Sequence, residues 1–292
     1  MPRRLSASAY ASLVACPYQF FVRHMLGLAR ADEVREALEK RDYGEFVHRI
    51  LWRFHAAYPQ LLGQADAALA AALEAISREV FAPAIEENFL EHAWLARWLE
   101  RVPAYIAWQR AREAAGWRTV AGELAREIAL PCEDAAAVML TGRLDRLDRR
   151  ADGAEAVLDY KTQDAQELRG RLADAGEDVQ LACYALLQGE GVAEAAYVAL
   201  DGEKPFALPL PGVQEMARAQ GERLAATIAA LAAGAALPAH GAPQVCEYCE
   251  ARGLCRRDYH TLPPPNPGHE GAGKNPGANP DGRPPTAGGP AR

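Results

Sequence analysis

The chain has 292 residues, half of them apolar, and a formal net charge of −7 at pH 7. This composition excludes a fibrous or wholly disordered protein and predicts a globular fold with one large core or two small ones. The apolar run 224–237 is too short to span a bilayer, and the N-terminal residues lack the apolar core of a secretory signal. We therefore expect a cytoplasmic protein that does not contact a membrane.

The first third of the sequence shows helical periodicity. Ser6 or Ser8 can cap a first helix, and Pro17 suits the first turn of a second one. Apolar residues then recur at helical spacing, and Ala, Leu and Glu dominate the segments that follow. We expect the last of these helices to form an insertion over about 60–116. The predicted helices cover about 6–16, a short stretch from 17, then 42–58, 64–81 and 84–115.

The periodicity then changes to the two-residue alternation of β-strands, with Val120 and Leu124 predicted on one face and Glu123 and Glu127 on the other. The order helix, three-stranded meander, helix, strand predicts an α/β fold for residues 1–260. Residues 261–292 are rich in Pro and Gly and predict a disordered tail. The elements expected are strands near 120–130, 138–145 and 156–161 with a turn at Asp152 and Gly153, a helix over 178–189, strands over 192–200 and 205–210, and a helix over 213–233.

Three polar residues of the second and third strands have the chemistry of a metal-dependent hydrolase. Strand alternation places Asp159 and Lys161 on one face of their strand, with Tyr160 between them facing the core, and Asp145 lies on the polar face of the preceding strand. Carboxylates suit Mg²⁺ or Mn²⁺, and a nearby amine can stabilise a phosphoryl transition state. A solvated, salt-bridged strand face is the alternative interpretation, because the pattern Asp-x-Lys is short and common.

The motifs around these residues resemble the RecB/AddB-type nuclease domains of the PD-(D/E)XK superfamily, over nearly the whole chain before the tail. Their order along the chain is similar to the order in that family. The matching motifs are Leu5-Ser-Ala-Ser, Cys16-Pro-Tyr, Leu26-Gly-Leu, Gly44-x-x-x-His48, Gly142-Arg-Leu-Asp145-Arg, Leu158-Asp-Tyr-Lys161-Thr and Gln180-x-x-x-Tyr184.

The resemblance implies a restriction-endonuclease-like core and a role for each matching residue. His48, Asp145, Asp159 and the carbonyl of Tyr160 would bind Mg²⁺ or Mn²⁺, and Lys161 would be the catalytic lysine. It also implies a deoxyribonuclease, expected to be an exonuclease that processes DNA ends in recombinational repair, beside a helicase partner or as part of a longer helicase chain. The alternative from another class is a non-catalytic DNA-binding or scaffolding module. Gln180 and Tyr184, which share one helical face, would lie at the rim of the active site.

The cysteines predict a second metal site. Cys246-x-x-Cys249 and Cys255 lie in a loop-like segment, 244–258, and six cysteines in a cytoplasmic chain favour metal binding or burial over disulfides. The resemblance to AddB-type and related CRISPR-associated nucleases implies that Cys16 is the fourth ligand of a [4Fe–4S] cluster that joins the two ends of the domain. Zinc is the alternative. Cys132 and Cys183 are adequately explained as small apolar residues.

The negative net charge means that contacts to DNA phosphates would need a local basic strip. Glu127 could supply a further carboxylate to the metal site, although a solvated strand face explains it equally well. The arginines that could form the strip are Arg3, Arg4, Arg23, Arg30, Arg143, Arg146, Arg252, Arg256 and Arg257.

Overall fold

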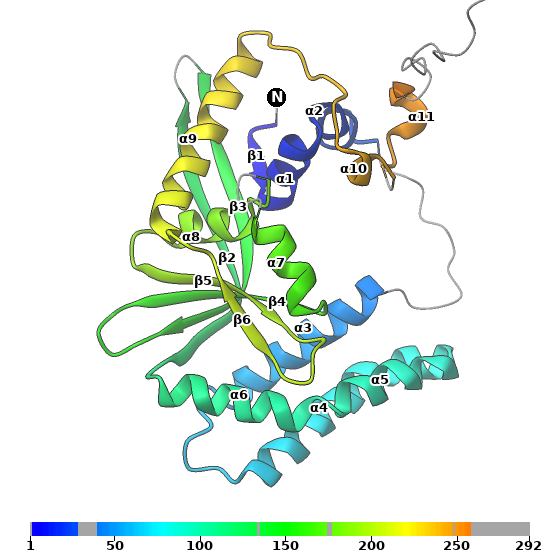
Figure 1. Ribbon diagram of the computed structural model, residues 1–292, viewed down its shortest axis with the longest axis vertical. Coiled ribbons are helices and arrows are strands. Elements are labelled where there is room, and N and C mark those ends of the chain that lie inside the picture. Colours follow the sequence, from blue (N-terminus) through cyan, green and yellow to red (C-terminus); the bar gives the residue numbers. More distant parts are fainter. Residues whose placement is uncertain (1, 29–39, 133–134, 174–176, 248, 258–292) are drawn as a thin grey trace, which may run out of the picture. The chain divides into compact units, whose positions relative to one another are not determined.

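The strands of the computed structural model form one mixed sheet of six strands within the residues it describes, which are 2–28, 40–132, 135–173, 177–247 and 249–257 (Figure 1). The compact unit that contains this sheet ends at Cys255, and the predicted tail 261–292 lies outside the described residues. The strands are β1 (Arg4–Ser6), β2 (Arg118–Cys132), β3 (Ala135–Arg149), β4 (Glu155–Lys161), β5 (Val192–Ala199) and β6 (Phe206–Pro209).

Strand β3 organises the sheet. Along one edge it pairs antiparallel with β2 over its full length. Its other edge is shared, because β1 pairs parallel with Met139–Thr141 and β4 pairs antiparallel with Arg146–Arg149. Residues 142–145 lie between these two ladders and have no strand partner on that edge in the described structure. The sheet therefore opens at Asp145, beside the end of β4 that carries Asp159 and Lys161.

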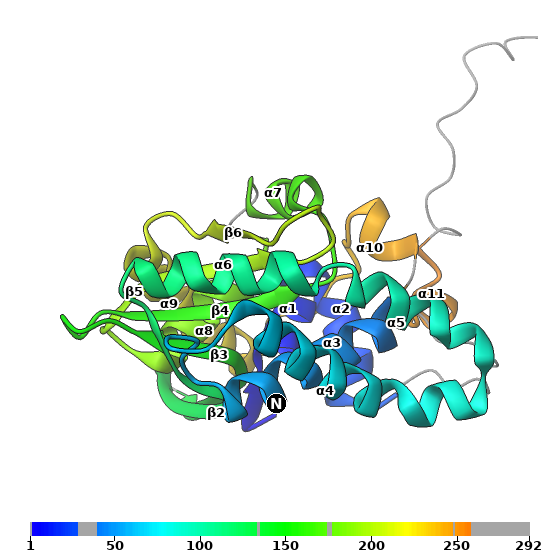
Figure 2. The same ribbon diagram turned by 90° about the horizontal axis from the view of Figure 1, so that it is seen from below.

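Helices cover both faces of the sheet (Figures 1 and 2). One apolar core joins α1, α8 and α9 to the sheet through residues such as Val157 and Tyr197, and a second joins α3, α4, α5 and α6 through Leu158 and Tyr160. Consecutive residues of β4 thus enter opposite cores, as expected for a central strand buried on both faces. The helices are α1 (Ala7–Ala15), α2 (Pro17–Phe20), η1 (Phe21–Met25), α3 (Lys40–Ala57), α4 (Asp66–Glu87), η2 (Phe89–Glu91), α5 (His92–Leu99), α6 (Val102–Ala114), α7 (Ala165–Ala173), α8 (Gln180–Gln188), α9 (Val213–Ala232), α10 (Pro243–Glu247) and α11 (Arg252–Cys255).

Most predicted elements are confirmed, including the turn at Asp152 and Gly153, where Gly153 has the positive φ of 88° that glycine tolerates. Four elements were not predicted, namely β1, α7 and the short helices α10 and α11 within the segment expected to be loop-like. Strand β1 is too short for periodicity, although Ser6 caps α1 as expected by accepting a hydrogen bond from Ala9 N at 3.0 Å. Helix α7 buries only Leu168, so it shows no apolar stripe.

The predicted break between the helices 64–81 and 84–115 is wrong. Helix α4 continues through Pro83 to Glu87, and the second segment is divided among η2, α5 and α6. None of the helices in the described part of the chain is both long and apolar enough to cross a membrane.

Candidate active site

Helix α3 brings His48 to the opening in the sheet. The imidazole Nε2 lies 2.8 Å from the carbonyl oxygen of Tyr160, and Nδ1 lies 3.3 Å from Asp145 Oδ2. Gly44, one turn earlier, permits this approach, because a Cβ there would lie 3.3 Å from Thr162 Oγ1. His48 therefore contacts two of the groups predicted to share a metal ion with it.

The Asp145 carboxylate replaces a backbone hydrogen bond between β3 and β4. The β3–β4 ladder ends at Arg146 and Leu158, and Asp145 Oδ2 then accepts a hydrogen bond of 2.9 Å from the backbone N–H of Tyr160. One carboxylate oxygen thus joins the two strands just where they diverge. The contact fixes Asp145 beside the Tyr160 carbonyl and His48.

Asp159 and Lys161 form a close ion pair inside the site. Lys161 Nζ lies 2.6 Å from Asp159 Oδ2, and the Asp159 side chain is only 2% exposed. Gln180 at the start of α8 spans the pair, donating to Asp159 Oδ1 at 2.9 Å and accepting from Lys161 Nζ at 3.1 Å. The Gln180 amide also donates to Tyr184 OH at 3.0 Å. The lysine is therefore held on two sides. Gln180 and Tyr184, which the family resemblance places at the rim of the active site, lie beside this ion pair.

Glu123 of β2 also faces the site, and sequence reasoning missed it. Ligand atoms of Glu123, His48 and Asp145 lie within 4.8 Å of one another. Glu123 has a φ of 51°, in the left-handed region that a non-glycine residue rarely adopts. This conformation breaks the strand alternation and turns the side chain toward α3. Glu127, the carboxylate suggested by alternation, instead pairs with Arg4 at 2.6 Å on the surface.

The site concentrates negative charge, and the pKa values respond. Burial and the neighbouring Asp145 charge raise the pKa of Asp159 to about 6. Burial and Asp145 also raise the pKa of Glu123. Burial disfavours the imidazolium form of His48, but the hydrogen bond to Asp145 and the carboxylate charges outweigh it and raise the pKa of His48 to about 9. This electrostatic environment attracts a cation.

These groups line a cleft of about 870 Å³. Its wall includes His48, Asp145, Lys161 and Glu123, and five basic side chains also line it. The cleft thus combines an anionic centre, suited to a metal ion, with a cationic margin, suited to phosphates. The basic residues of the margin are Lys40, Arg41, Arg49, Arg143 and Arg171.

Comparison with known proteins agrees with this geometry. Residues 4–256 match the PD-(D/E)XK nuclease superfamily. The chain belongs to the PD-(D/E)XK nuclease superfamily.

More specific relatives of this PD-(D/E)XK chain are distant. A component of the ATP-dependent helicase/deoxyribonuclease of Streptococcus equi subsp. zooepidemicus is 26% identical over 166 residues, which are 55% of this chain and 14% of that protein. An uncharacterised protein of Rickettsia bellii is 25% identical over 166 residues, 55% of this chain and 19% of its own length. The chain thus spans less than a fifth of these relatives. The crystal structure of SSO0001 covers 87% of this chain and 86% of its own at 13% identity, and its TM-score of 0.38 supports no inference.

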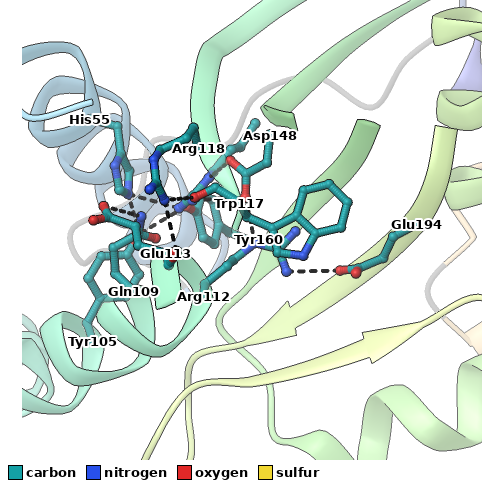
Figure 3. Close-up of polar contacts among 11 residues, drawn as sticks. His55, Tyr105, Gln109, Arg112, Glu113, Trp117, Arg118, Asp148, Tyr160 and Glu194 are labelled. Carbon is teal, nitrogen blue, oxygen red and sulfur yellow. Dashed lines mark hydrogen bonds and ion pairs between the residues drawn. The ribbon is translucent and has the colours of Figure 1, made fainter. Parts of the chain in front are cut away.

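A buried polar network that includes Asp148 and His55 holds the phenol of Tyr160, the residue whose backbone contacts Asp145 and His48 (Figure 3). Arg146 donates to both carboxylate oxygens of Asp148, at 2.6 and 3.0 Å, and both side chains are almost completely buried. The Arg146 guanidinium also donates to the phenol of Tyr160 at 3.0 Å and to His55 Nε2 at 3.0 Å. Because Tyr160 also contacts Asp145 and His48 through its backbone, the network anchors the residue at the centre of the site.

Helix α6 completes this network. Tyr105 of α6 hydrogen-bonds the Tyr160 hydroxyl at 2.9 Å and His55 Nε2 at 2.6 Å. Arg112 of α6 donates to Asp148 at 2.5 Å and to Glu194 at 3.0 Å. Burial and the Arg146 charge lower the pKa of His55, which is therefore neutral and accepts from the guanidinium.

The structure excludes Arg146 from the predicted arginine strip. Arg146 is 1% exposed and cannot contact DNA. Arg4 and Arg23 pair with Glu127 and Glu250, and Arg30 lies outside the described residues. Of the arginines proposed for the strip, only Arg143 lines the cleft, where it pairs with Glu123 at 2.8 Å and keeps 71% of its side chain exposed. The basic margin comes instead mainly from α3, whose exposed face gave no distinct sequence signal.

Cysteines from the two ends of the folded unit lie close together. A Cβ on Gly241 would lie 3.2 Å from Cys16 Cβ and 3.4 Å from Cys246 Sγ. Gln19, three residues after Cys16, has its amide nitrogen 3.5 Å from Cys249 Sγ. Burial and the nearby Cys16 and Cys246 raise the pKa of the Cys249 thiol. Cys255 ends α11, the helix that follows Cys249 by two residues.

The other two cysteines have ordinary structural surroundings. Cys183 is 1% exposed in the core between α8 and the sheet, and burial raises the pKa of its thiol to about 12. Cys132 ends β2, where its sulfur lies 3.6 Å from the Leu130 carbonyl oxygen.

Proposed function

We propose that this chain is a divalent-metal-dependent deoxyribonuclease that hydrolyses phosphodiester bonds. The observation that carries the proposal is the convergence of His48, Asp145 and the Tyr160 carbonyl on one side of the cleft with the Asp159–Lys161 pair beside them. The donor set fits Mg²⁺ or Mn²⁺, because hard carboxylate and carbonyl oxygens predominate and one imidazole is acceptable to Mn²⁺. Glu123 is available as a further ligand.

Each residue of the cleft has a separate role in the proposed hydrolysis. A bound divalent ion would supply Lewis acidity toward the scissile phosphate and a more acidic water. Lys161 Nζ, fixed by Asp159 and Gln180, donates to the phosphate oxygens as negative charge builds up in the transition state. Gln180 orients the Asp159 carboxylate by donating to it, and Tyr184 positions the Gln180 amide by accepting from it. The exposed arginines of the margin hold the flanking phosphates.

A cleavage assay tests the proposal. End-labelled single-stranded and duplex DNA is incubated with the wild-type protein in Mg²⁺, Mn²⁺ or a chelator, and RNA of the same sequence serves as the competing substrate. We expect DNA cleavage with either ion, none with the chelator, and a loss of about 10²–10⁴-fold in Lys161→Ala with DNA binding retained. The variant Phe206→Ala, altered at an exposed residue outside the cleft, is the matched control. Binding without cleavage under all conditions would favour the non-catalytic module instead.

We also propose that Cys16, Cys246, Cys249 and Cys255 bind a [4Fe–4S] cluster. Support comes from the proximity of Cys16 to Cys246 and Cys249. Cys183 lies in the apolar core and Cys132 ends β2, so each has another structural explanation. An all-thiolate set suits either iron–sulfur or zinc. Bound there, the cluster would cross-link residues more than two hundred positions apart, which restricts the unfolded chain.

The biological setting is proposed from the distant relatives. The Streptococcus protein is one component of a helicase/deoxyribonuclease. A similar setting here would be exonucleolytic processing of DNA ends during recombinational repair, with a helicase as partner or in the same polypeptide. Co-purification with a helicase from the source cells, and cleavage that becomes ATP-dependent on duplex DNA, are the expected observations.

A further inference from the structure

Trp52 is an exposed aromatic residue inside the cleft. Its side chain belongs to α3 and lies one turn after His48, so the two residues share a helix face. Trp52 is 45% exposed, and of the large apolar side chains exposed on the described residues it alone lines the cleft. The site chemistry derived above assigns it no role.

The backbone of β2 supports the indole. A Cβ on Gly122 would lie 2.9 Å from Trp52 Cδ1 and 3.8 Å from Nε1, so the five-membered ring rests where any other residue would place a side chain. Glycine at this position thus creates space for the ring on the strand. A ring held in this way loses little conformational freedom when it stacks with a ligand.

The surroundings of Trp52 carry the charges that a nucleic-acid strand needs. Arg49, on the same helix, is exposed and forms no ion pair with any residue that the structure describes. Arg143 of β3 lines the same cleft with 71% of its side chain exposed. The rise from His48 to Trp52 is about 6 Å along the helix axis. The indole is therefore close enough to the proposed metal site to contact a nucleotide next to the reacting phosphate.

We propose that Trp52 is a base-stacking site that takes an unpaired nucleotide adjacent to the scissile phosphate. The proposal rests on the proposed function in taking DNA as the ligand and the metal site as the place where the phosphate reacts. An aromatic ring needs an open base face, and in the interior of a duplex both faces of each base are covered by its neighbours. The chemistry at Trp52 thus selects an unstacked base, while Arg49 and Arg143 hold the phosphates on either side. Stacking of this kind tolerates any base.

Equilibrium binding tests the proposal without requiring cleavage. Fluorescence anisotropy is measured with a labelled oligo-dT strand of about 16 nucleotides, in a Lys161→Ala background that keeps the strand intact. Trp52→Ala should weaken binding by about 5- to 150-fold, from a stacking contribution of about 1–3 kcal/mol per base. Trp52→Phe, which keeps an aromatic face, should recover most of the affinity. Phe206→Ala, which removes an exposed ring away from the cleft, should bind as tightly as the parent.

A strand of the same length made of abasic nucleotides distinguishes stacking from other roles. It keeps the phosphates but offers no base, so the Trp52→Ala protein and its parent should bind it equally. Equal binding of oligo-dT by both proteins would overturn the proposal, as would an equal loss on oligo-dT and on the abasic strand. If the wild-type protein cleaves no DNA but the Trp52 variants still show the stacking contribution, the nuclease function is refuted and the stacking site is retained.

Discussion

Replacing Arg146 with Met should destabilise the protein by about 3–5 kcal/mol, because it leaves part of a buried ion pair without its partner. The guanidinium makes two hydrogen bonds to Asp148 and one each to Tyr160 and His55, and its side chain is 1% exposed. Methionine approximates the volume but supplies no donor. Arg112 remains at 2.5 Å from Asp148, which keeps the loss within this range.

Thermal and urea unfolding measure this loss. For a folded unit of this size, about 3–5 kcal/mol lowers the melting temperature by about 6–20 °C. The variants Arg146→Met, Asp148→Asn and the double replacement form a cycle. The loss of stability in the double variant should be smaller than the sum of the two single losses by about 0.5–3 kcal/mol, because neither charge is then buried without a partner.

The pH dependence gives a second readout. Burial opposes ionisation of Asp148, but Arg146 and Arg112 more than compensate and hold its pKa below the ordinary value. The stability that this carboxylate contributes is therefore present above about pH 4 and is lost as the pH falls through the lowered pKa. Without Arg146 the pKa of Asp148 rises, so the deficit of Arg146→Met should shrink as the pH is lowered toward 4. A deficit under about 1 kcal/mol at neutral pH, or no coupling in the cycle, would refute this reasoning.

Three further predictions concern the two proposed metal sites. Asp145→Asn and Asp159→Asn should each weaken Mn²⁺ binding in calorimetric titration, since each removes an anionic ligand, and unchanged affinity in both would point to another site. Because His48 has a pKa of about 9 in the metal-free chain, a proton competes with the ion below that pH, and Mn²⁺ affinity should rise about tenfold per pH unit between about pH 7 and 8.5. A flat profile would contradict His48 as a ligand. Protein purified without oxygen should be brown with about four irons per chain, and Cys16→Ser should bleach it and lower its melting temperature whereas Cys132→Ser should not. A colourless protein with stoichiometric zinc would reject iron–sulfur but keep the cross-link.

Strand alternation located the centre of the site because β4 is regular. Asp159 and Lys161 fall on one polar face, and the family motif adds His48, whose position depends on a helix far away in sequence. Alternation failed on β2 for a local reason. A register shift next to Val120 leaves that residue 48% exposed. The left-handed backbone of Glu123 then interrupts the alternation of side chains between the two faces of the strand. Neither irregularity has a signature in the residue types.

The role of Arg146 could not be predicted from its neighbours in sequence. Arginine on a strand is usually exposed. Burial of Arg146 is favourable because its guanidinium donates hydrogen bonds to Asp148, His55 and Tyr160. Those partners come from α3, β3 and β4, so tertiary structure determines the environment. The same limit applies to α7, which depends on contact with β5 and β6 rather than on an apolar stripe of its own.

The position of β1 has a consequence for how the chain is made. Leu5 is 1% exposed, and its carbonyl oxygen accepts a hydrogen bond from Thr141, which lies 136 residues further along the chain. At a synthesis rate of about 5–20 residues per second, the first strand waits about 7–27 s on the ribosome for its partner. The apolar face of α1, including Tyr10 and Leu13, is uncovered during that interval. Slower translation lengthens the wait, so chaperone supply during synthesis should affect the yield of folded protein.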